Sequence, residues 1–401
     1  MEFADSNRVH ALKARVTAFV ETEVIPAEAR YQAEKREVGP WDTPPVMEEL
    51  KKKARAAGLW NLFLPGDPGV GLTNLEYAPL AEISGRSPWI APEAMNCSAP
   101  DTGNMEILAH FASPAVRERW LTPLLNGEIR SVYSMTEPEV ASSDADNIAT
   151  SITEDSGGFR IQGRKWWSSG AMSPRCKIAI VMGCSDPRGE RHRRHTMLAV
   201  PLDTPGVKVE RSTSVFGYSD SGHGGHAFIH YDDAWVPREN LLGQLHEGFA
   251  IAQARLGPGR IHHAMRLIGM AERAYDLMCT RALYRFAFGK AVAEQGVVQD
   301  WIAEARIRIE QCRLLVLKTA WLMDTVGNKG AATEISAIKV AAPAMATWVI
   351  DRAIQVHGGA GVSQETPLAE LYAQARMLHI ADGPDEVHKM ALARRELRRY
   401  R

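Results

Sequence analysis

The stretch LHIADGPDEVHKM, near the C-terminal end of the chain, concentrates acidic side chains around a turn. Gly383 and Pro384 are typical of a turn that starts a helix, and carboxylates at a helix N-terminus are stabilised by its partial positive charge. Asp382, Asp385 and Glu386 therefore have a structural explanation. They also suit chemistry, because a carboxylate held near a reactive C–H bond can act as a general base. We expect one of the three to be catalytic.

Other chemistries are less well supported. HGGAGV at residues 357–362 contains a Gly-x-Gly pair, but it follows a helix-like stretch and lacks the third glycine of a dinucleotide-binding fold. His223, His226 and His230 are spaced like metal ligands, yet no compatible carboxylate or thiolate set accompanies them. A nucleophile-elbow motif is also missing, which disfavours a Ser-His-Asp hydrolase. We therefore predict neither a Rossmann domain nor a metal site.

The composition is that of a large globular protein. Of 401 residues, 45% are hydrophobic and 24% are charged, and the formal net charge is −1. Such a chain can bury a large core in two or three domains. Because the chain is almost neutral, it has no general attraction for nucleic acid or for anionic membrane surfaces. The expected partner is a small molecule.

The cysteines and the N-terminus indicate the compartment. The five cysteines form no C-x-x-C pair, and their odd number fits a reducing compartment better than a disulfide framework, so we expect buried thiols. The N-terminal MEFADSNRVHALKARV is amphipathic and charged, and no stretch reaches the roughly 18 apolar residues of a membrane span. We expect a soluble, cytoplasmic protein, with the mitochondrial matrix as the alternative.

Three segments with different periodicity predict a mainly α protein with a central β-domain. Residues 1–130 look helical, since apolar residues such as Val9 and Leu12 keep the spacing of one buried face. Residues 131–242 consist of short strand-like runs separated by turn clusters, which is typical of an antiparallel β-domain. The remaining residues, 243–401, return to helical patterns. The strand-like runs are FRIQGRKWW, KIAIVMG, TMLAVPL, VKVERS and FIHYDDAWV.

The last segment has the pattern of a helical bundle. Apolar side chains recur there every seven residues, as in the seam between packed helices, up to the sequence GNKG. A second long helix is predicted from about residue 333 to residue 356, and Pro343 favours a bend in it. We predict a C-terminal four-helix bundle. The residues of the seam are Ile302, Ile309, Val316 and Met323.

Five segments occur in an order and spacing that resemble the FAD-dependent acyl-CoA dehydrogenases. The resemblance covers nearly the whole chain. It implies an N-terminal α-helical domain, a β-domain and a C-terminal four-helix bundle, in an enzyme of fatty-acid β-oxidation that binds FAD. It also implies an acyl-CoA substrate, electron-transfer flavoprotein as electron acceptor, and a homodimer or homotetramer. The segments are YSMTEPEVASSDA (133–145), GRKWWSSGA (163–171), RFAFGK (285–290), QVHGGAGV (355–362) and IADGPDEVH (380–388).

The resemblance assigns a flavin site. It places Trp167 beside the isoalloxazine ring and the Ser169 hydroxyl toward its N5, and an indole wall and a hydroxyl donor suit those positions. Trp166 and Trp167 point to opposite faces of a strand, so one of them is an ordinary strand aromatic. The rest of the FAD site is expected across a subunit interface, although the glycines alone would fit an ordinary helix end. The implied cofactor-binding residues are Tyr133, Met135, Thr136, Trp167, Ser169, Arg285, Phe288, Gln299, Gln355, Gly358, Gly359 and Glu386.

The basic run RGERHRRH, residues 188–195, has two interpretations of equal weight. A charge run is commonly a solvated hairpin tip. In acyl-CoA dehydrogenases, however, the equivalent loop lies near the adenosine phosphates of coenzyme A, which arginines could bind. The substrate-binding residues implied here are Ser142, Ser143, Arg191, Arg193 and Arg194.

The resemblance narrows the choice of catalytic carboxylate to Asp382. Many family members carry a glutamate in a Tyr-Glu-Gly-Thr turn that aligns with residues 381–384. Asp382 takes the base position with an arm one methylene shorter, so the turn or the substrate must lie closer. The implied reaction removes the α-proton while a β-hydride passes to flavin N5, with the thioester oxygen polarised by a flavin ribityl hydroxyl and a backbone N–H. Gly259 stands where some branched-chain relatives keep an alternative base, which leaves Asp382 alone.

The segments ADGPDEVH, KWWSSGA and LGPGRIHH resemble more specifically a subgroup that some eukaryotes fuse to a kinase-like domain. That subgroup is associated with breakdown of 4-hydroxyacyl-CoA through 4-phosphoacyl-CoA, so a hydroxyl or phosphate at C4 of the substrate is expected. Arg260, His262 and His263 lie within one helical turn and could bind that phosphate. In the alternative, Arg260 is structural and the two histidines are packing residues.

Two rival functions remain open. The same fold hosts nitroalkane oxidases, which use an aspartate base and oxygen, so Asp382 makes an oxidase the best enzymatic alternative. A flavin-free helical scaffold is the alternative from another class. Chemically competent groups at every proposed flavin and base position favour the enzyme.

Overall fold

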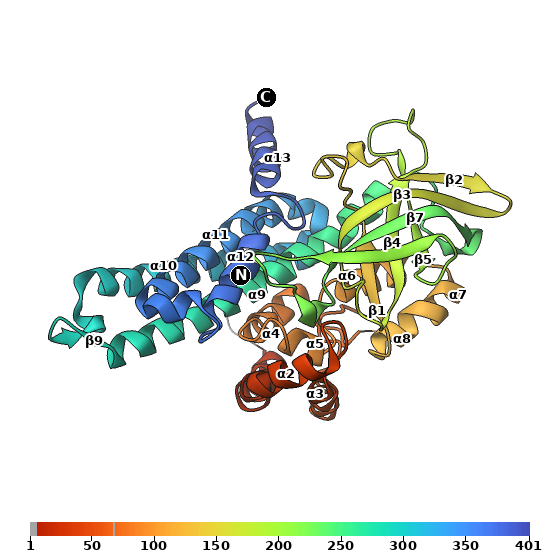
Figure 1. Ribbon diagram of the computed structural model, residues 1–401. Helices are drawn as coiled ribbons and strands as arrows, with labels where there is room; N and C mark the ends of the chain where they lie inside the picture. Colours follow the sequence, from red (N-terminus) through yellow and green to blue (C-terminus); the bar gives the residue numbers. More distant parts are fainter. Residues whose placement is uncertain (1–5, 67–68) are drawn as a thin grey trace. The chain divides into compact units, whose positions relative to one another are not determined.

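The computed structural model describes residues 6–66 and 69–401, drawn in Figure 1. Residues 1–5 of the predicted amphipathic N-terminus lie outside the described part. The described chain forms two compact units, each assembled from separated segments. The boundaries of the three domains predicted along the sequence stay predictions. Unit 1 draws on Met1–Pro26, Pro65–Pro92 and Arg260–Arg401, and unit 2 on Ala27–Leu64 and Glu93–Gly259.

The N-terminal segment is helical, as its apolar spacing predicts. Local caps define two of the helix starts. The Ser6 side chain accepts a hydrogen bond from the backbone N–H of Val9, and Thr73 forms a capping box with Glu76. The helices are α1 (Asn7–Phe19), α2 (Ile25–Val38), α3 (Pro45–Ala56), α4 (Asn74–Ser84), α5 (Ala91–Ala94), α6 (Asp101–Phe111), α7 (Pro114–Val116) and α8 (Thr122–Leu125).

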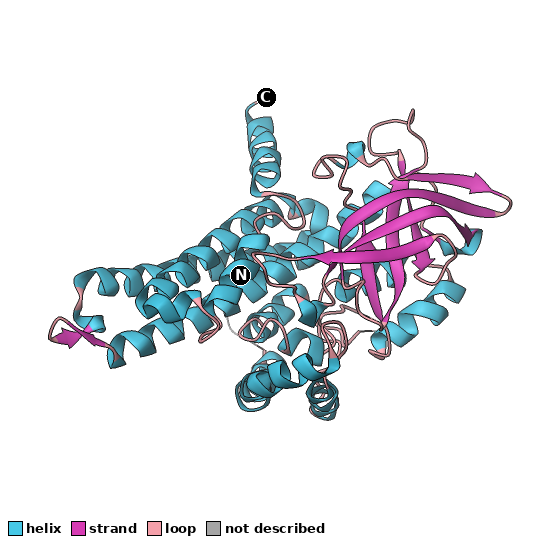
Figure 2. Ribbon diagram, in the orientation of Figure 1, coloured by secondary structure: helices cyan, strands magenta, loops and turns pink. Residues whose placement is uncertain are grey.

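Unit 2 contains an eight-stranded sheet, coloured magenta in Figure 2. All five strand-like runs of the sequence form strands of this sheet. The strand order is β6-β7-β3-β2-β4-β5-β8, and β1 pairs with β4. The strands are β1 (Arg130–Ser134), β2 (Ser151–Asp155), β3 (Gly158–Ser169), β4 (Cys176–Cys184), β5 (His195–Pro201), β6 (Val207–Thr213), β7 (His226–Pro237) and β8 (Leu241–Leu242).

The predicted antiparallel β-domain has two strand pairs that differ from the prediction. β1 and β2 each run parallel to β4. A hairpin forces its two strands to be antiparallel, whereas a long connection allows either direction. Both strands reach β4 through long stretches of chain, so no local turn dictates their direction.

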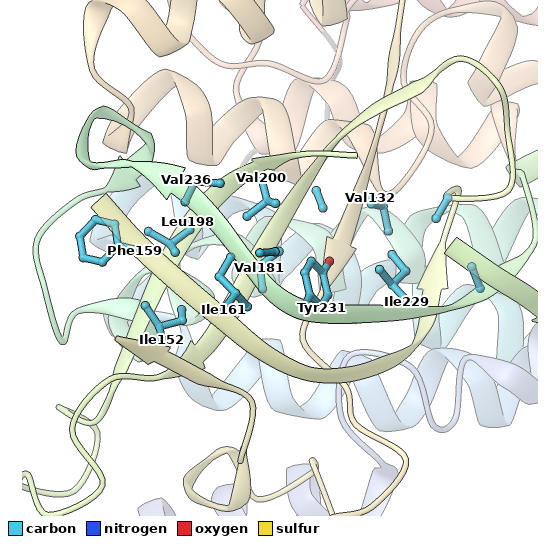
Figure 3. Close-up of a cluster of buried hydrophobic side chains, with 14 of the residues drawn as sticks. Val132, Ile152, Phe159, Ile161, Val181, Leu198, Val200, Ile229, Tyr231 and Val236 are labelled. Atoms are coloured by element: carbon cyan, nitrogen blue, oxygen red, sulfur yellow. The ribbon is translucent and has the colours of Figure 1, made fainter. Parts of the chain in front are cut away.

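The sheet buries an aliphatic and aromatic core, shown in Figure 3. Alternate residues of one strand, such as Phe159 and Ile161, both enter this core because successive side chains point to opposite faces. Tyr231 is fully buried, and its hydroxyl donates a hydrogen bond to Ser134 Oγ at 3.0 Å. The core thereby fixes β1 and β3, which carry predicted flavin-binding residues.

The C-terminal helices lie mainly in unit 1, where α10 and α11 pack together (Figure 1). The predicted seam is buried at Ile309, Val316 and Met323 and half-buried at Ile302. At Gly327, within the GNKG sequence, the backbone leaves the helical region with φ of +72°. The elements are α9 (Gly248–Tyr284), β9 (Phe286–Ala287), β10 (Lys290–Ala291), α10 (Gly296–Gly330), α11 (Ala332–His357), α12 (Leu368–Met377) and α13 (Asp385–Leu397).

The cysteines are less uniform than predicted. Cys97, Cys176 and Cys312 are buried, but Cys184 and Cys279 are half-buried, so the prediction of buried thiols is wrong for those two. Across residues 6–66 and 69–401, every helix is too short or too polar to cross a bilayer. The same ranges contain no group of three or more His, Cys, Asp or Glu side chains arranged to hold a metal ion.

Candidate active site

The turn that carries Asp382 has an unusual backbone. Helix α13 begins directly after Pro384, as the sequence predicts. Asp382 has a left-handed conformation with φ of +57°, and Gly383 follows with φ of +103°. A Cβ on Gly383 would lie 2.9 Å from His388 Nε2, so glycine is the residue that fits. A non-glycine residue with positive φ costs free energy unless its surroundings hold it.

Two side chains of unit 1 hold the backbone of Asp382 by its carbonyl oxygen. Arg260 Nε donates a hydrogen bond to this oxygen at 3.1 Å, and His388 Nε2 lies 3.2 Å from it as a second donor. The Asp382 carboxylate contacts His263, with 3.6 Å between Oδ2 and Nε2, and 18% of the Asp382 side chain is exposed. The backbone of the candidate base is therefore fixed, while its carboxylate keeps an exposed face.

Buried titratable groups support the same turn. Lys339 is 2% exposed, and its Nζ donates a hydrogen bond to the carbonyl oxygen of Leu378 at 2.6 Å. Burial lowers the pKa of Lys339 to about 8, although the charge of Asp382 opposes the shift. Burial, and then the charge of Arg260, lower the pKa of His388 to about 4. His388 is therefore neutral near pH 7, with one ring nitrogen as donor and the other as acceptor.

In unit 2, a buried lysine fixes the segment that follows β1. Lys165 is 0% exposed, and its Nζ donates hydrogen bonds to Met135 O at 2.7 Å and Glu137 Oε1 at 2.8 Å. The backbone N–H of Trp166 donates to Thr136 O at 3.0 Å. These bonds hold the backbone of Met135 and Thr136, two of the predicted flavin contacts, next to β3.

Two predicted flavin contacts, Trp167 and Ser169, both lie next to His226. Trp167 has φ of +51° where the pairing of β3 with β7 is interrupted, and such an interruption re-aims a side chain. The rings of Trp167 and His226 lie 5.1 Å apart, and Ser169 Oγ lies 2.9 Å from His226 Nδ1. Asp220 Oδ2 is 3.3 Å from His226 Nε2, although the ring is not aligned for a hydrogen bond. The structure thus brings Trp167 and Ser169 together on one side chain.

The predicted coenzyme A residues belong to two loops of unit 2. Arg191 Nε donates a hydrogen bond to Asp146 Oδ2 at 2.7 Å, which ties the basic loop to the loop that follows β1. Ser142, in that second loop, is half-buried, and Ser143 is exposed. The basic loop is therefore anchored by part of its charge rather than fully solvated. The other predicted guanidinium groups of this loop, one exposed and one half-buried, belong to Arg193 and Arg194.

The FAD residues predicted in unit 1 are exposed. Phe288, in the turn of the β9–β10 hairpin, is 99% exposed and has φ of +54°. Gly358 and Gly359 follow α11, and an added Cβ would meet nothing within 4 Å at either position. A ligand can therefore approach this stretch of backbone closely. The remaining predicted contacts in this unit are also exposed, namely Arg285, Gln299, Gln355 and Glu386.

The residues fit FAD in their chemistry. The half-buried indoles of Trp166 and Trp167 offer flat apolar surface, and Trp166 Nε1 is buried without a hydrogen-bond partner among the residues described. The Ser169 hydroxyl and the open backbone at Gly358 add polar contacts, and Arg285 adds a positive charge for phosphate. The roles of these residues stay predictions.

Sequence reasoning missed several residues that shape the site. Lys339 is one of them, although a lysine between Ile338 and Val340 in an apolar helix is a visible sign of a buried charge. The role of His388 depends on the turn folding back onto its own helix, which no spacing rule indicates. The sequence offers His226 only as a metal ligand, because its contact with Ser169 arises from the pairing of two distant strands.

Three family models match the chain in sequence order. The acyl-CoA dehydrogenase N-terminal domain matches residues 6–128, the middle domain residues 132–230 and the C-terminal domain residues 246–397. Together they cover most of the chain.

Individual relatives agree with this assignment. FadE2 of Mycobacterium tuberculosis is 56% identical over 401 residues, which span all of this chain and 98% of FadE2. A solved acyl-CoA dehydrogenase homologue from Mycobacterium abscessus is 51% identical, with a TM-score of 0.96 and complete coverage of both chains. Acyl-CoA dehydrogenase family member 11 of Rattus norvegicus is 52% identical over 98% of this chain, which spans only 51% of that longer relative. The chain therefore belongs to the acyl-CoA dehydrogenase family of FAD-dependent oxidoreductases.

Proposed function

We propose that this enzyme dehydrogenates acyl-CoA thioesters with Asp382 as catalytic base, giving 2-enoyl-CoA from substrates with a hydroxyl or phosphate at C4. Family membership supports FAD-dependent dehydrogenation of acyl-CoA. The observation that carries the choice of base is the turn itself. Arg260 and His388 bind the Asp382 carbonyl oxygen, while 18% of the side chain remains exposed. A carboxylate on a fixed backbone, with one face accessible, is suited to remove a substrate proton.

The unusual backbone supports an aspartate in place of a longer glutamate. A positive φ at Asp382 directs its Cβ differently from a helical or extended residue, so a short arm can still be aimed at the substrate. His263, 3.6 Å from the carboxylate, can orient the group that takes the α-proton. Gly383 lets the chain turn without a clash against His388.

FAD, when bound, supplies the acceptor for the β-hydride. The residues of unit 2 contribute orientation. Trp167 offers an aromatic wall, and His226 holds the Ser169 hydroxyl at 2.9 Å. Lys165 fixes the backbone of Met135, so the flavin-facing segment needs little rearrangement when the cofactor binds.

The proposed partners are electron-transfer flavoprotein, as electron acceptor, and further copies of the chain. Large apolar side chains on the hairpin support an oligomer, because Phe288 is 99% exposed and nearby Tyr284 is 82% exposed. Such side chains commonly mark surfaces that another chain covers. We propose a homodimer or homotetramer in which the hairpin helps to complete a neighbouring FAD site.

The three residues predicted to bind a phosphate at C4, Arg260, His262 and His263, make different contacts. Arg260 donates to the Asp382 carbonyl oxygen, and the ring of His262 is buried edge-on against Tyr77 with 5.0 Å between centroids. These contacts favour the structural alternative for both residues. His263 remains the candidate from this set for a polar substituent near the base.

An anaerobic titration of the holoenzyme tests the proposal. The flavin absorbance near 450 nm would be followed while pentanoyl-CoA, 4-hydroxypentanoyl-CoA or 4-phosphopentanoyl-CoA is added. We expect bleaching by thioesters, with the 4-substituted compounds effective at lower concentration. Equal bleaching by thioesters with and without a C4 substituent would contradict only the proposed substrate. A yellow flavin that no thioester bleaches would contradict the proposed dehydrogenase function.

The aspartate at position 382 also favours one alternative, a nitroalkane oxidase. A nitroalkane arm in the same experiment decides between the two reactions. Rapid oxygen consumption with nitroethane, together with no response to any thioester, would replace the dehydrogenase proposal with the oxidase. We expect no nitroalkane turnover.

A further inference from the structure

Arg255 is a buried arginine of unit 2 that lacks the ion pair such residues usually have. Arg255 lies on α9 and is 8% exposed. Its guanidinium stacks over the ring of Tyr133 at 3.9 Å, and its Nε donates to Asn104 Oδ1 at 3.3 Å. Among the described residues it forms no ion pair. Burying a charge costs free energy unless an opposite charge is paired with it. The guanidinium of Arg255 is therefore suited to bind an anion.

Arg130 in the same unit shows what full neutralisation looks like. It is 7% exposed and forms ion pairs with both Glu93 and Asp101. Two carboxylates therefore offset its charge within the protein. Arg255, at almost the same burial, has a π face and a neutral amide instead.

Arg255 forms no ion pair with the buried carboxyl group of Glu106, although its charge acts to lower the pKa of that group. Glu106 on α6 is 8% exposed, and burial raises its pKa to about 8 despite the opposing charge of Arg255. At neutral pH most Glu106 side chains are therefore protonated. A protonated carboxyl group carries no negative charge, so Glu106 does not offset the charge of Arg255 at neutral pH.

The surroundings of Arg255 are built to hold its guanidinium in place. A Cβ on Gly103 would lie 2.9 Å from Arg255 Nε and 3.1 Å from its Cζ, so the glycine makes room for the side chain. Asn104 is fully buried and is oriented in turn, because its Nδ2 donates to Ser131 Oγ at 2.9 Å. An arginine fixed in this way has lost its side-chain entropy before any ligand binds.

We propose that Arg255, with Asn104, forms a subsite for an anionic group carried on the acyl portion of the substrate. The proposal rests on the proposed acyl-CoA dehydrogenation. The guanidinium of Arg255 stacks on Tyr133, which is a predicted flavin contact. We therefore expect the subsite to lie near the substrate carbons that react with the flavin. The basic loop of residues 188–195 is a separate segment, and one of its two interpretations places the coenzyme A phosphates there. The group recognised is a phosphate or a carboxylate, since a guanidinium fork binds either one.

The test compares three thioesters with the same five-carbon acyl chain, namely pentanoyl-CoA, 4-phosphopentanoyl-CoA and glutaryl-CoA. The measured quantity is the concentration that half-bleaches the flavin of the anaerobic holoenzyme. The wild type should prefer one of the two anionic thioesters over pentanoyl-CoA, and the preferred one identifies the group. Arg255→Met should reduce this preference by about 10- to 100-fold, the usual weight of a hydrogen bond to a charged group.

Arg211→Met is the matched control. Arg211 also stacks on an aromatic ring in unit 2, at 3.9 Å from the centroid of Phe228, but it is exposed. Its removal should leave the preference unchanged. If Arg255→Met does not fold, Arg255→Lys decides, because it keeps the charge but loses the fork and should lower the preference several-fold.

The outcomes separate this proposal from the function on which it rests. Bleaching by pentanoyl-CoA without preference for either anion would overturn the subsite and leave the dehydrogenase intact. A preference that survives both Arg255 variants would also overturn it. Failure of all three thioesters to bleach the flavin would overturn both proposals.

Discussion

Two clusters of charged side chains, around Arg130 and around Asp382, differ in how their charges are paired. In unit 2, Arg130 forms ion pairs with Glu93 and Asp101, and the three side chains are at most 8% exposed. In unit 1, the contacts of Arg260 and His388 go to the backbone of Asp382, and 18% of its side chain stays exposed. The Arg130 network neutralises its charges internally, whereas the Asp382 turn keeps a carboxylate accessible.

Structural and functional charges differ in whether the protein neutralises them. Taking an ion pair out of water costs several kcal/mol per ion, roughly offset by mutual attraction, so such networks hold a fold in one arrangement. A turn with a left-handed aspartate and a required glycine is strained instead, and strain of this kind gathers at functional sites. We therefore expect changes at Asp382 to slow the reaction and changes at Arg130 to destabilise the fold.

The largest expected effect is on activity. Asp382→Asn keeps the shape of the side chain but removes the proton acceptor, so flavin reduction by an acyl-CoA should slow by about 10²- to 10⁴-fold, the usual weight of a general base. The variant should still bind FAD, because the flavin-facing residues are untouched. Stopped-flow absorbance of the yellow protein measures the rate. Normal flavin reduction by this variant would show that Asp382 is a structural residue, as Arg130 is.

The next effect is on stability. Arg130→Met leaves the carboxylates of Glu93 and Asp101 buried without their shared cation, and breaking a buried pair from one side costs about 3–5 kcal/mol. Urea unfolding would measure the free energy of unfolding. The matched control is Arg160→Met, because Arg160 pairs with Asp155 and Asp233 at the surface, where such pairs contribute about 0–1 kcal/mol. Equal losses in the two variants would contradict the structural role of the Arg130 network.

The sequence predicted the parts of the fold that have a local signal. Alternation in FRIQGRKWW and its neighbours predicts β3 to β7, and the seven-residue repeat predicts the buried face of α10. The parallel pairing of β1 with β4 has no such signal, because it depends on contacts between residues about 45 positions apart. The same reason hides the assembly of unit 1 from three segments of chain.

In the candidate site, too, the sequence predicts only the features that have a local signal. The letters ADGPDE, together with the resemblance, point to Asp382, since a turn and its acidic residues are local features. Of the two donors that hold its carbonyl, Arg260 comes from the distant helix α9 and His388 from the helix that follows the turn. Arg255 looks like any helical arginine in the sequence, and its burial depends on Gly103 of another helix. Residue types thus indicate the reacting group, while the residues that position it require the structure.

A further prediction concerns the pH dependence of stability, through His388. Burial and Arg260 lower the pKa of His388 to about 4, from an ordinary value of 6.5. Between these values the unfolded chain binds the proton and the folded one does not, so the free energy of unfolding should fall as the pH is lowered from about 6.5 to 4. His388 should contribute up to about 3 kcal/mol to this fall. It reports on the Asp382 turn, because the neutral ring places its donor nitrogen 3.2 Å from the Asp382 carbonyl oxygen.

His388→Gln isolates the contribution. A glutamine amide can still donate to the Asp382 carbonyl oxygen, but it does not titrate, so the variant should lose less stability than the wild type below pH 6.5. Urea unfolding of both proteins at several pH values gives the difference, which should stay constant from pH 7 to 8, where the His388 ring is neutral in both states. Parallel curves down to pH 4.5 would show that His388 is not buried as a neutral donor. The Asp382 carbonyl would then lose one of its two holding contacts, and the contrast with the Arg130 network would rest on Arg260 alone.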